Sequence, residues 1–298
     1  MNRYDITILT SEAYLHPTEP DWYVQQIIDE DRLLRVALER KGLRVHRIDW
    51  TSRHFDWSET SAVIFRSVWD YPQHIDEFKR FIVSISEKTI LINPLSTIMW
   101  NLDKHYLRDL NDRGIETPKT IYIEKGDEIS LQQLHADHGL TDSILKPVMS
   151  AGARHTYRLN KHTLEKIEPM FQELISSEAM MLQPFLHSVL THGEITLVVI
   201  GGTFTHAVLK SAKSGDFRVQ DDFGGTVQPY NPTKEEISFA EKVVSVCEPL
   251  PYYARVDLLR NNDDDLVVSE LELIEPELWF RFHPASADIL ADTIKKMF

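Results

Sequence analysis

The segment from Tyr253 to Pro276, with the sequence YARVDLLRNNDDDLVVSELELIEP, constrains the fold and the chemistry of this chain more than any other stretch. Two runs of strand-forming residues, 254–259 and 266–274, flank a polar turn of asparagine and aspartate residues. This pattern predicts a β-hairpin. The carboxylates carried by its strands are the unusual part, and they point to its function.

Four charged side chains of this hairpin should lie close together. Side chains alternate between the two faces of a strand, so Arg255 and Asp257 share one face. Glu270 and Glu272 likewise share one face of the returning strand. Paired face to face, the three acids would repel one another unless a cation lies among them, and oxygen-only ligands suit Mg²⁺ with its preference for phosphate oxygens. The hairpin therefore indicates a nucleotide site, and a polar strand face that simply meets water is the alternative.

Length and composition narrow the class of protein. The 298 residues allow two domains or one large one, and 42% hydrophobic residues suffice for real cores. With 32 basic and 46 acidic residues the net charge is −14, which argues against nucleic acid as a partner. The single cysteine, Cys247, excludes an intrachain disulfide and a multi-cysteine metal site. We find neither a signal peptide nor a membrane-spanning run, so we expect a cytoplasmic protein without a membrane partner.

The N-terminal third alternates strand-like and helical patterns. The expected strands are 6–10, 43–49, 62–66 and 90–93, the expected helices are 23–42 and 75–85, and 11–23 should be irregular. Such alternation predicts a parallel sheet whose binding residues follow the carboxyl ends of the strands. Arg66 and Ser67 follow one such end, and the arginine could bind a substrate carboxylate through two hydrogen bonds. Pairing of Arg66 with a local acid is the equally weighted alternative.

The remainder contains further helices, strands and hairpins. A helix is expected from 96 to 114, strands at 143–147 and 179–185, a hairpin at 194–200 and 203–210, and helices at 233–247 and 285–297. A small-residue loop, MSAGARH, follows the strand that ends in Lys146, and it holds one glycine, Gly152. Backbone N–H groups of such a loop can approach phosphates, although the loop does not match a P-loop.

From Ser96 to Pro276 the order of these features resembles the ATP-grasp ligases. The family pattern has a helix lysine, a strand lysine before a small-residue loop, an adenine-binding hinge, a basic hairpin, and finally RVD with a second acidic strand. The spacing is similar to glutathione synthetase-like and D-alanine ligase-like members, and IEPELWF resembles the cyclo-ligase of cycloserine biosynthesis. The resemblance implies an α/β and α+β fold: a parallel pre-ATP-grasp domain, 1–95, and an ATP-grasp domain, 96–298, with lobes 96–190 and 191–298.

The resemblance also implies roles for individual residues. Those expected to bind ATP are Lys104, Lys146, Gly152, Gln183, Phe185, Leu186 and Glu194, with backbone groups of the three hinge residues at the adenine. Those expected to hold Mg²⁺, as two ions, are Asp257, Glu270 and Glu272. The family usually has asparagine at the position of Glu272, which leaves the second metal open, and the glycine-poor loop leaves the lid geometry open.

The chemistry implied by the resemblance is the formation of an acyl phosphate. A carboxylate is a poor electrophile, so ATP phosphorylates it and an amine then displaces phosphate. Negative charge gathers at each step, and Lys210, Arg218 and Arg255 can stabilise it together with Mg²⁺. Arg255 should face the reacting phosphate. Arg281 could reach a substrate carboxylate, and a surface pair with Glu277 is its alternative.

Four functions remain open at this point. The leading one is an ATP-dependent carboxylate–amine ligase acting on a small amino-acid-like molecule. The others are an intramolecular cyclo-ligase, a ligase of peptide or protein termini, and a nucleotide-binding regulatory protein without catalysis. The presence of the three acids, both lysines and Arg255 argues against the last. The sequence leaves a monomer and a homodimer equally open.

Overall fold

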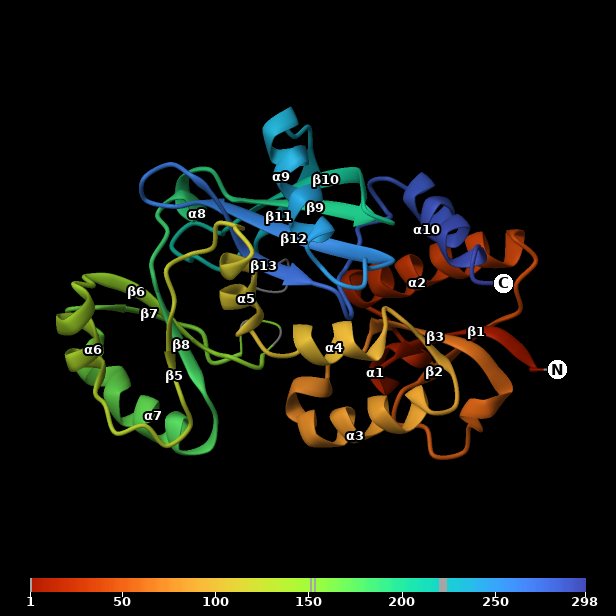
Figure 1. Cartoon of the computed structure of the whole chain (residues 1–298), viewed down its shortest axis with the longest axis horizontal. Coiled ribbons are helices and arrows are strands. Elements are labelled where there is room, and N and C mark those ends of the chain that lie inside the picture. The colour runs from red at the N-terminus through yellow and green to blue at the C-terminus, as the bar shows by residue number, and fades with distance from the viewer. Residues whose placement is uncertain (1, 151, 153, 220–223) are drawn as a thin grey trace.

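The computed structural model describes residues 2–150, 152, 154–219 and 224–298. Three sheets organise these residues, and Figure 1 shows them as an N-terminal sheet at one end of the molecule, a second sheet at the other end, and a third sheet above and between them. No helix of the described residues is both long and apolar enough to cross a membrane. The mixture of one parallel sheet with two antiparallel sheets confirms the predicted fold class.

The N-terminal sheet is parallel, with strand order β2-β1-β3-β4, as the alternating pattern predicts. Its strands are β1 (Tyr4–Thr10), β2 (Val45–Asp49), β3 (Thr60–Ser67) and β4 (Ile90–Ile92). Its helices are α1 (Glu12–Leu15), α2 (Trp22–Arg40) and α3 (Ile75–Ser86), with short 3₁₀ turns at Trp57–Glu59 and Tyr71–Gln73. The helix α2 begins at Asp21, whose side chain accepts a hydrogen bond from the N–H of Val24. The short helix α1 lies in a segment that was expected to be irregular.

The expected helix over 96–114 is wrong, because the structure has two short helices there. These are α4 (Leu95–Asn101) and α5 (Tyr106–Asp112). Lys104 lies in the turn between them, where its N–H donates to the carbonyl of Val148 at 2.9 Å rather than to a helical neighbour. The side chain of Asn101 bonds to the backbone of Leu271 and Leu273. These tertiary hydrogen bonds replace the helical ladder and turn the Lys104 side chain towards the interior.

The second sheet is antiparallel, with strand order β5-β8-β6-β7. Its strands are β5 (Ile121–Ile123), β6 (Asp142–Pro147), β7 (Tyr157–Asn160) and β8 (Met180–Pro184). Helices α6 (Leu131–His138) and α7 (Leu164–Ser177) pack against it around Leu145, Phe171 and Leu182. The sequence predicts β6 and β8, whereas β7 and the two helices were not foreseen.

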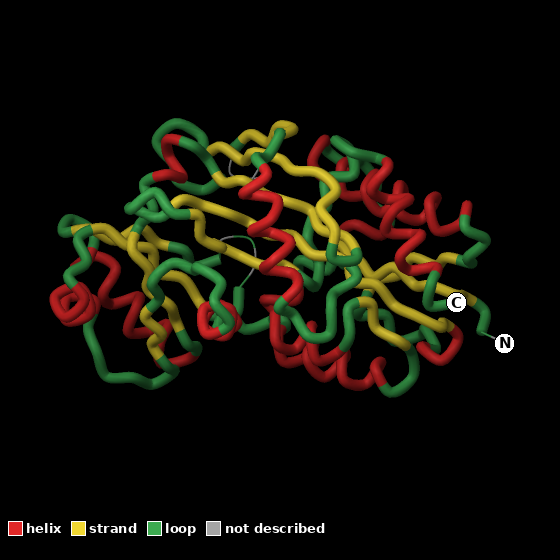
Figure 2. Tube along the Cα trace, turned by 45° about the horizontal axis from the view of Figure 1, so that its top comes forward, coloured by secondary structure: helices red, strands yellow, loops and turns green. Residues whose placement is uncertain are grey.

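The third sheet has five antiparallel strands in the order β11-β10-β9-β12-β13. They are β9 (Glu194–Ile200), β10 (Thr203–Ser211), β11 (Thr226–Tyr230), β12 (Tyr253–Arg260) and β13 (Leu266–Glu272). The helices of this region are α8 (Ser188–Thr191), α9 (Lys234–Ser245) and α10 (Ala285–Lys295). The predicted capping box of Thr233 and Glu236 starts α9, which crosses the face of the sheet in Figure 2. The antiparallel pairs β9–β10 and β12–β13 confirm both predicted hairpins.

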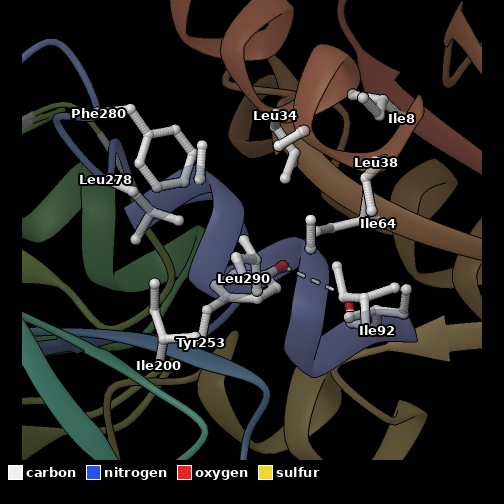
Figure 3. Close-up of a cluster of buried hydrophobic side chains, with 14 of the residues drawn as sticks. Ile8, Leu34, Leu38, Ile64, Ile92, Ile200, Tyr253, Leu278, Phe280 and Leu290 are labelled. Atoms are coloured by element: carbon white, nitrogen blue, oxygen red, sulfur yellow. Dashed lines mark hydrogen bonds between the residues drawn. The ribbon is translucent and has the colours of Figure 1, made fainter. Parts of the chain in front are cut away.

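One hydrophobic core joins the N-terminal sheet to the third sheet. Figure 3 shows Ile8 and Ile64 of the former together with Ile200 and Tyr253 of the latter, and Leu290 of α10 lies in the same cluster. The hydroxyl of Tyr253 also donates to the carbonyl of Ile274 at 2.6 Å. The boundary at 95/96 stays a prediction, but this shared core holds the two predicted domains in a defined relative position.

Candidate functional site

A cavity of about 480 Å³ lies where the three parts of the chain meet, a volume typical of small-molecule sites. Its wall brings together thirteen of the residues that the sequence singles out. They are Lys104, Lys146, Gly152, Gln183, Phe185, Leu186, Glu194, Lys210, Arg218, Arg255, Asp257, Glu270 and Glu272. They come from the second and third sheets and from the turn before α5, so tertiary folding assembles one site from distant segments.

The register of the β12–β13 hairpin places the acids face to face. Asp257 lies opposite Glu270, and Arg255 lies opposite Glu272. A bulge follows Asp257, and such a bulge re-aims neighbouring side chains. One oxygen from each of the three acids lies within 4.8 Å of the others. This oxygen-only donor set fits Mg²⁺.

Asp257 is the centre of the charge network. It is 1% exposed, and it accepts hydrogen bonds from Thr196 at 2.8 Å, Lys210 at 3.0 Å and Arg255 at 2.8 Å. Burial alone would raise the pKa of Asp257, but the two cations outweigh burial and lower it to about 2. The carboxylate is therefore charged at neutral pH.

The two glutamates of β13 differ in their electrostatics. Burial opposes ionisation of Glu270, but Lys104 at 2.7 Å and Lys146 outweigh it and hold the pKa of Glu270 below its usual range. Burial raises the pKa of Glu272 to about 8 against the opposing effect of Arg255, which pairs with it, and the neighbouring acids add to the rise. A bound cation would relieve this crowding of negative charge.

The two predicted phosphate-binding lysines reach the cavity from different segments. The ammonium group of Lys104 bonds to Glu270 and donates to the carbonyl of Ser150 at 2.9 Å. Lys146 lies on β6, and no described carboxylate is within ion-pair distance of it. Burial lowers the pKa of Lys146, which is the expected effect on a cation without a close partner. Gly152 adopts φ +60°, in the small-residue loop whose residues 151 and 153 lie outside the described part of the chain.

Two residues expected to line the adenine site, Gln183 and Phe185, already form hydrogen bonds within the protein. Gln183 donates from its side chain to Thr120 at 2.9 Å. The N–H of Phe185 donates to the carbonyl of Asp142 at 2.9 Å, and its carbonyl accepts from Asn262 at 3.1 Å. The N–H of Phe185 is therefore already bonded within the protein, whereas its carbonyl keeps a second lone pair, and the expected contact of these backbone groups with adenine stays a prediction.

Two further cations of the cavity are paired with acids. Lys210 bonds to both Glu194 and Asp257; burial alone would lower the pKa of Lys210, and these acids outweigh burial and raise it. Arg218 pairs with Asp216 through two hydrogen bonds, at 3.1 and 2.6 Å. Glu194 also accepts from Ser269 at 3.1 Å. Lys210, Glu194 and Arg255 thus form one connected network with Asp257, whereas Arg218 pairs with Asp216.

The expectation that Arg66 and Ser67 bind substrate is wrong. Arg66 is 3% exposed and pairs with Glu30 of α2 at 2.5 Å, as the alternative had it. The hydroxyl of Ser67 bonds to Thr10 at 2.7 Å and to Asp31 at 3.0 Å. The side chains of Arg66 and Ser67 are directed to α2 and β1 rather than to the cavity, so these polar groups hold the N-terminal unit together.

Arg281 likewise does not line the cavity. It pairs with Glu277, which was the alternative for this residue. Its expected role in substrate binding is therefore not supported by its position.

Sequence reasoning missed Trp279 and the residue that positions it. Trp279 has φ +46°, a left-handed backbone conformation that is strained for a bulky residue. Its ring lies under the cations of Arg255, at 5.1 Å, and Lys210, at 5.6 Å. Glu30 accepts from the N–H groups of Leu278 at 2.7 Å and Phe280 at 3.3 Å, on either side of this tryptophan. No local pattern could reveal this contact, because Glu30 and Leu278 are far apart in the sequence.

Two protein families match separate parts of the chain. Residues 6–93 match the N-terminal domain of D-cycloserine synthetase DcsG, and residues 114–249 match the ATP-grasp domain of prokaryotic glutathione synthetase. The cycloserine biosynthesis protein DcsG of Streptomyces lavendulae is 29% identical over 257 residues, which cover 83% of this chain and 86% of that protein.

Three solved structures are similar to this chain over nearly its whole length. The crystal structure of D-cycloserine synthetase DcsG has a TM-score of 0.86 at 27% identity and covers 98% of this chain and 99% of that chain. D-alanine–D-alanine ligase from Bacillus anthracis, complexed with ATP, has a TM-score of 0.66 at 14% identity and covers 98% of this chain and 96% of that chain. The ATP-grasp ligase PsnB, complexed with a precursor peptide and AMPPNP, has a TM-score of 0.59 at 17% identity over 99% of this chain and 97% of that chain. The last two show a common fold.

Proposed function

We propose that the chain is an ATP-grasp ligase, an ADP-forming enzyme that uses ATP and Mg²⁺ to make carbon–nitrogen bonds, and that its substrate is a small amino-acid-like carboxylate. The carboxylate is activated as an acyl phosphate and then converted to an amide or a related bond. The observation that carries the proposal is the cavity in which three acids, two phosphate-directed lysines and Arg255 converge.

The first step transfers the γ-phosphoryl group. A carboxylate oxygen of the substrate bonds to the γ-phosphorus while the bond from that phosphorus to the bridging oxygen breaks, and ADP leaves. Asp257, Glu270 and Glu272 would hold Mg²⁺, which would supply positive charge to the phosphoryl group being transferred. Lys104 and Lys146 would hold the phosphates, since both line the cavity. These groups act by charge and position, so no protein nucleophile is needed.

The second step forms the carbon–nitrogen bond. An amine nitrogen attacks the acyl carbon, phosphate leaves, and the nitrogen loses a proton. Arg255 would face the oxygens that gain charge in both steps, because it lies on β12 beside the acids and its side chain is only 11% exposed. Trp279 packs against the guanidinium group and limits its movement. Lys210 and Arg218 add positive charge to the same wall.

An intramolecular cyclo-ligase is the second candidate. The likeness to D-cycloserine synthetase over both halves of the chain favours it. The cavity volume of about 480 Å³ also suits a small molecule that carries both the carboxylate and the nucleophile. A peptide-terminus ligase and a non-catalytic regulatory protein have less support, the latter because the charged residues needed for turnover are all present.

An ADP-release screen tests the proposal. Single amino-acid-like carboxylates and pairs are supplied with ATP and Mg²⁺, with and without hydroxylamine, which traps an acyl phosphate as a hydroxamate. A hydroxamate formed with one compound identifies the carboxylate donor. A product equal to one substrate minus water identifies ring closure, whereas a product that joins two substrates identifies intermolecular ligation. Absence of ADP and hydroxamate with every carboxylate would refute the proposal.

The variant Asp257→Asn tests the metal assignment. Loss of this charge should lower ADP release at least about 100-fold, as removal of one preorganised electrostatic group does. Circular dichroism and denaturant unfolding verify that the variant is folded. Undiminished ADP release by folded Asp257→Asn would remove Asp257 from the metal site.

A further inference from the structure

Glu275 is a buried carboxylate in the cavity wall that the chemistry above does not use. It lies three residues beyond the end of β13 and is 8% exposed. The indole N–H of Trp69 donates to the backbone carbonyl of Glu275 at 2.9 Å, so the backbone at this residue is held in place. The hydroxyl of Tyr71 lies beside its carboxylate. Glu275 is therefore well positioned and faces the cavity.

Within the described part of the chain, the Glu275 carboxylate forms no ion pair with a lysine or an arginine. Every other acid of the cavity wall forms an ion pair with a lysine or arginine: Glu194, Asp257, Glu270, Glu272 and Glu277. Among the described residues, Glu275 has none within 4.0 Å. Burial raises the pKa of Glu275 to about 7, as expected for a carboxylate without a counter-charge. Burying such a group is costly unless something that enters the cavity compensates it.

The wall next to Glu275 is aromatic. Trp69 lies edge-to-face with Tyr14, at a ring separation of 5.8 Å, and close to Tyr23, at 6.5 Å. All three rings line the cavity. Aromatic faces attract cations and exclude anions, so the carboxylate and the rings favour the same kind of ligand. That ligand is a compact organic cation, of which an ammonium group is the simplest.

We propose that Glu275 binds the ammonium group of the substrate, so that the enzyme selects carboxylates that also carry a cationic amine. This inference rests on the proposed function. The substrate carboxylate lies towards Arg255 and the metal-binding acids, and the ammonium group lies towards Glu275 and the aromatic wall. The cavity wall thereby recognises both charges of a zwitterion.

The test compares matched carboxylates with and without an amine. Wild-type enzyme and Glu275→Gln are supplied with ATP, Mg²⁺, hydroxylamine and either an amino acid or the acid of the same skeleton with hydrogen in place of the amine. For wild type we expect kcat/KM for hydroxamate formation to be higher for the amino acid, by about 10- to 100-fold, the effect of one hydrogen bond to a charged group. In Glu275→Gln this preference should disappear, because activity falls with the amino acid and stays within about threefold with the amine-free acid.

The variant Glu277→Gln is the matched control. It removes the same charge from the same wall, but that acid is already neutralised by Arg281, so we expect the preference for the amine to persist. A preference that survives in Glu275→Gln would overturn the inference, as would its loss in both variants. If Glu275→Gln does not fold, the wild-type comparison decides: equal use of amino and amine-free acids overturns the inference alone. If no carboxylate at all led to ADP release, the proposed function would be overturned as well.

Discussion

Replacing Glu30 with glutamine should destabilise the protein and release Trp279 from its position over the site. Glu30 is buried in α2, where it pairs with Arg66 and accepts the N–H groups of Leu278 and Phe280. Glutamine has nearly the same shape but no charge. Leu278 and Phe280 donate to different oxygens of Glu30, and glutamine keeps only one of these oxygens and presents N–H donors in place of the other.

The expected magnitude follows from these contacts. Hydrogen bonds to a charged acceptor are worth about 1.5–3 kcal/mol each, and removal of one partner of a buried ion pair costs about 3–5 kcal/mol. Among the described residues, the Nε and Nη1 atoms of Arg66 already lack hydrogen-bond partners, so the loss of Glu30 leaves this buried cation further unpaired. We therefore expect Glu30→Gln to lower the free energy of unfolding by about 3–5 kcal/mol. The double variant Glu30→Gln/Arg66→Met should lose less, because no buried charge is left unpaired.

The assay is denaturant unfolding of wild type, both single variants and the double variant, monitored by tryptophan fluorescence and circular dichroism. A double-mutant cycle isolates the coupling of Glu30 with Arg66, which should exceed about 1 kcal/mol. In the folded double variant, kcat for ADP release should fall while KM for ATP changes little, because Trp279 contacts Arg255 and Lys210 rather than the adenine wall. Additive single effects, or an unchanged kcat in the double variant, would refute this reasoning.

Three further changes probe other parts of the structure. Gly193→Ala should destabilise the protein by at least about 1–2 kcal/mol in denaturant unfolding, because φ is +78° there and a Cβ would collide with the carbonyl oxygen of Lys210. Burial lowers the pKa of His206 from 6.5 to about 4, so the unfolded state binds more protons than the folded state below pH 6.5. The free energy of unfolding should therefore fall by up to about 3 kcal/mol as the pH drops to 4. In His206→Asn this fall should be smaller. Lys146→Met should raise KM for ATP at least about tenfold with little loss of stability, since no described acid lies within ion-pair distance of that lysine; an unchanged KM would contradict its role.

Local patterns predicted those parts of the fold that local physics controls. The alternation of side chains put Arg255 with Asp257 on one face of β12 and Glu270 with Glu272 on one face of β13, and the capping box marked the start of α9. The turn at Lys104 escaped prediction because it depends on a hydrogen bond to Val148 and on the contacts of the Asn101 side chain. A helical pattern in the sequence cannot reveal such competition from distant groups.

The sequence by itself determined which chemical groups the site contains: the acids, the lysines and Arg255, together with their order along the chain. Only the tertiary structure decided which polar groups reach the cavity, because burial and pairing depend on packing between segments far apart in the chain. Arg66 lies at a strand end, as a binding residue would, yet it forms a buried ion pair with Glu30. Glu275 had no assigned role in the sequence, yet folding leaves its carboxylate buried, facing the cavity and without a cation among the described residues.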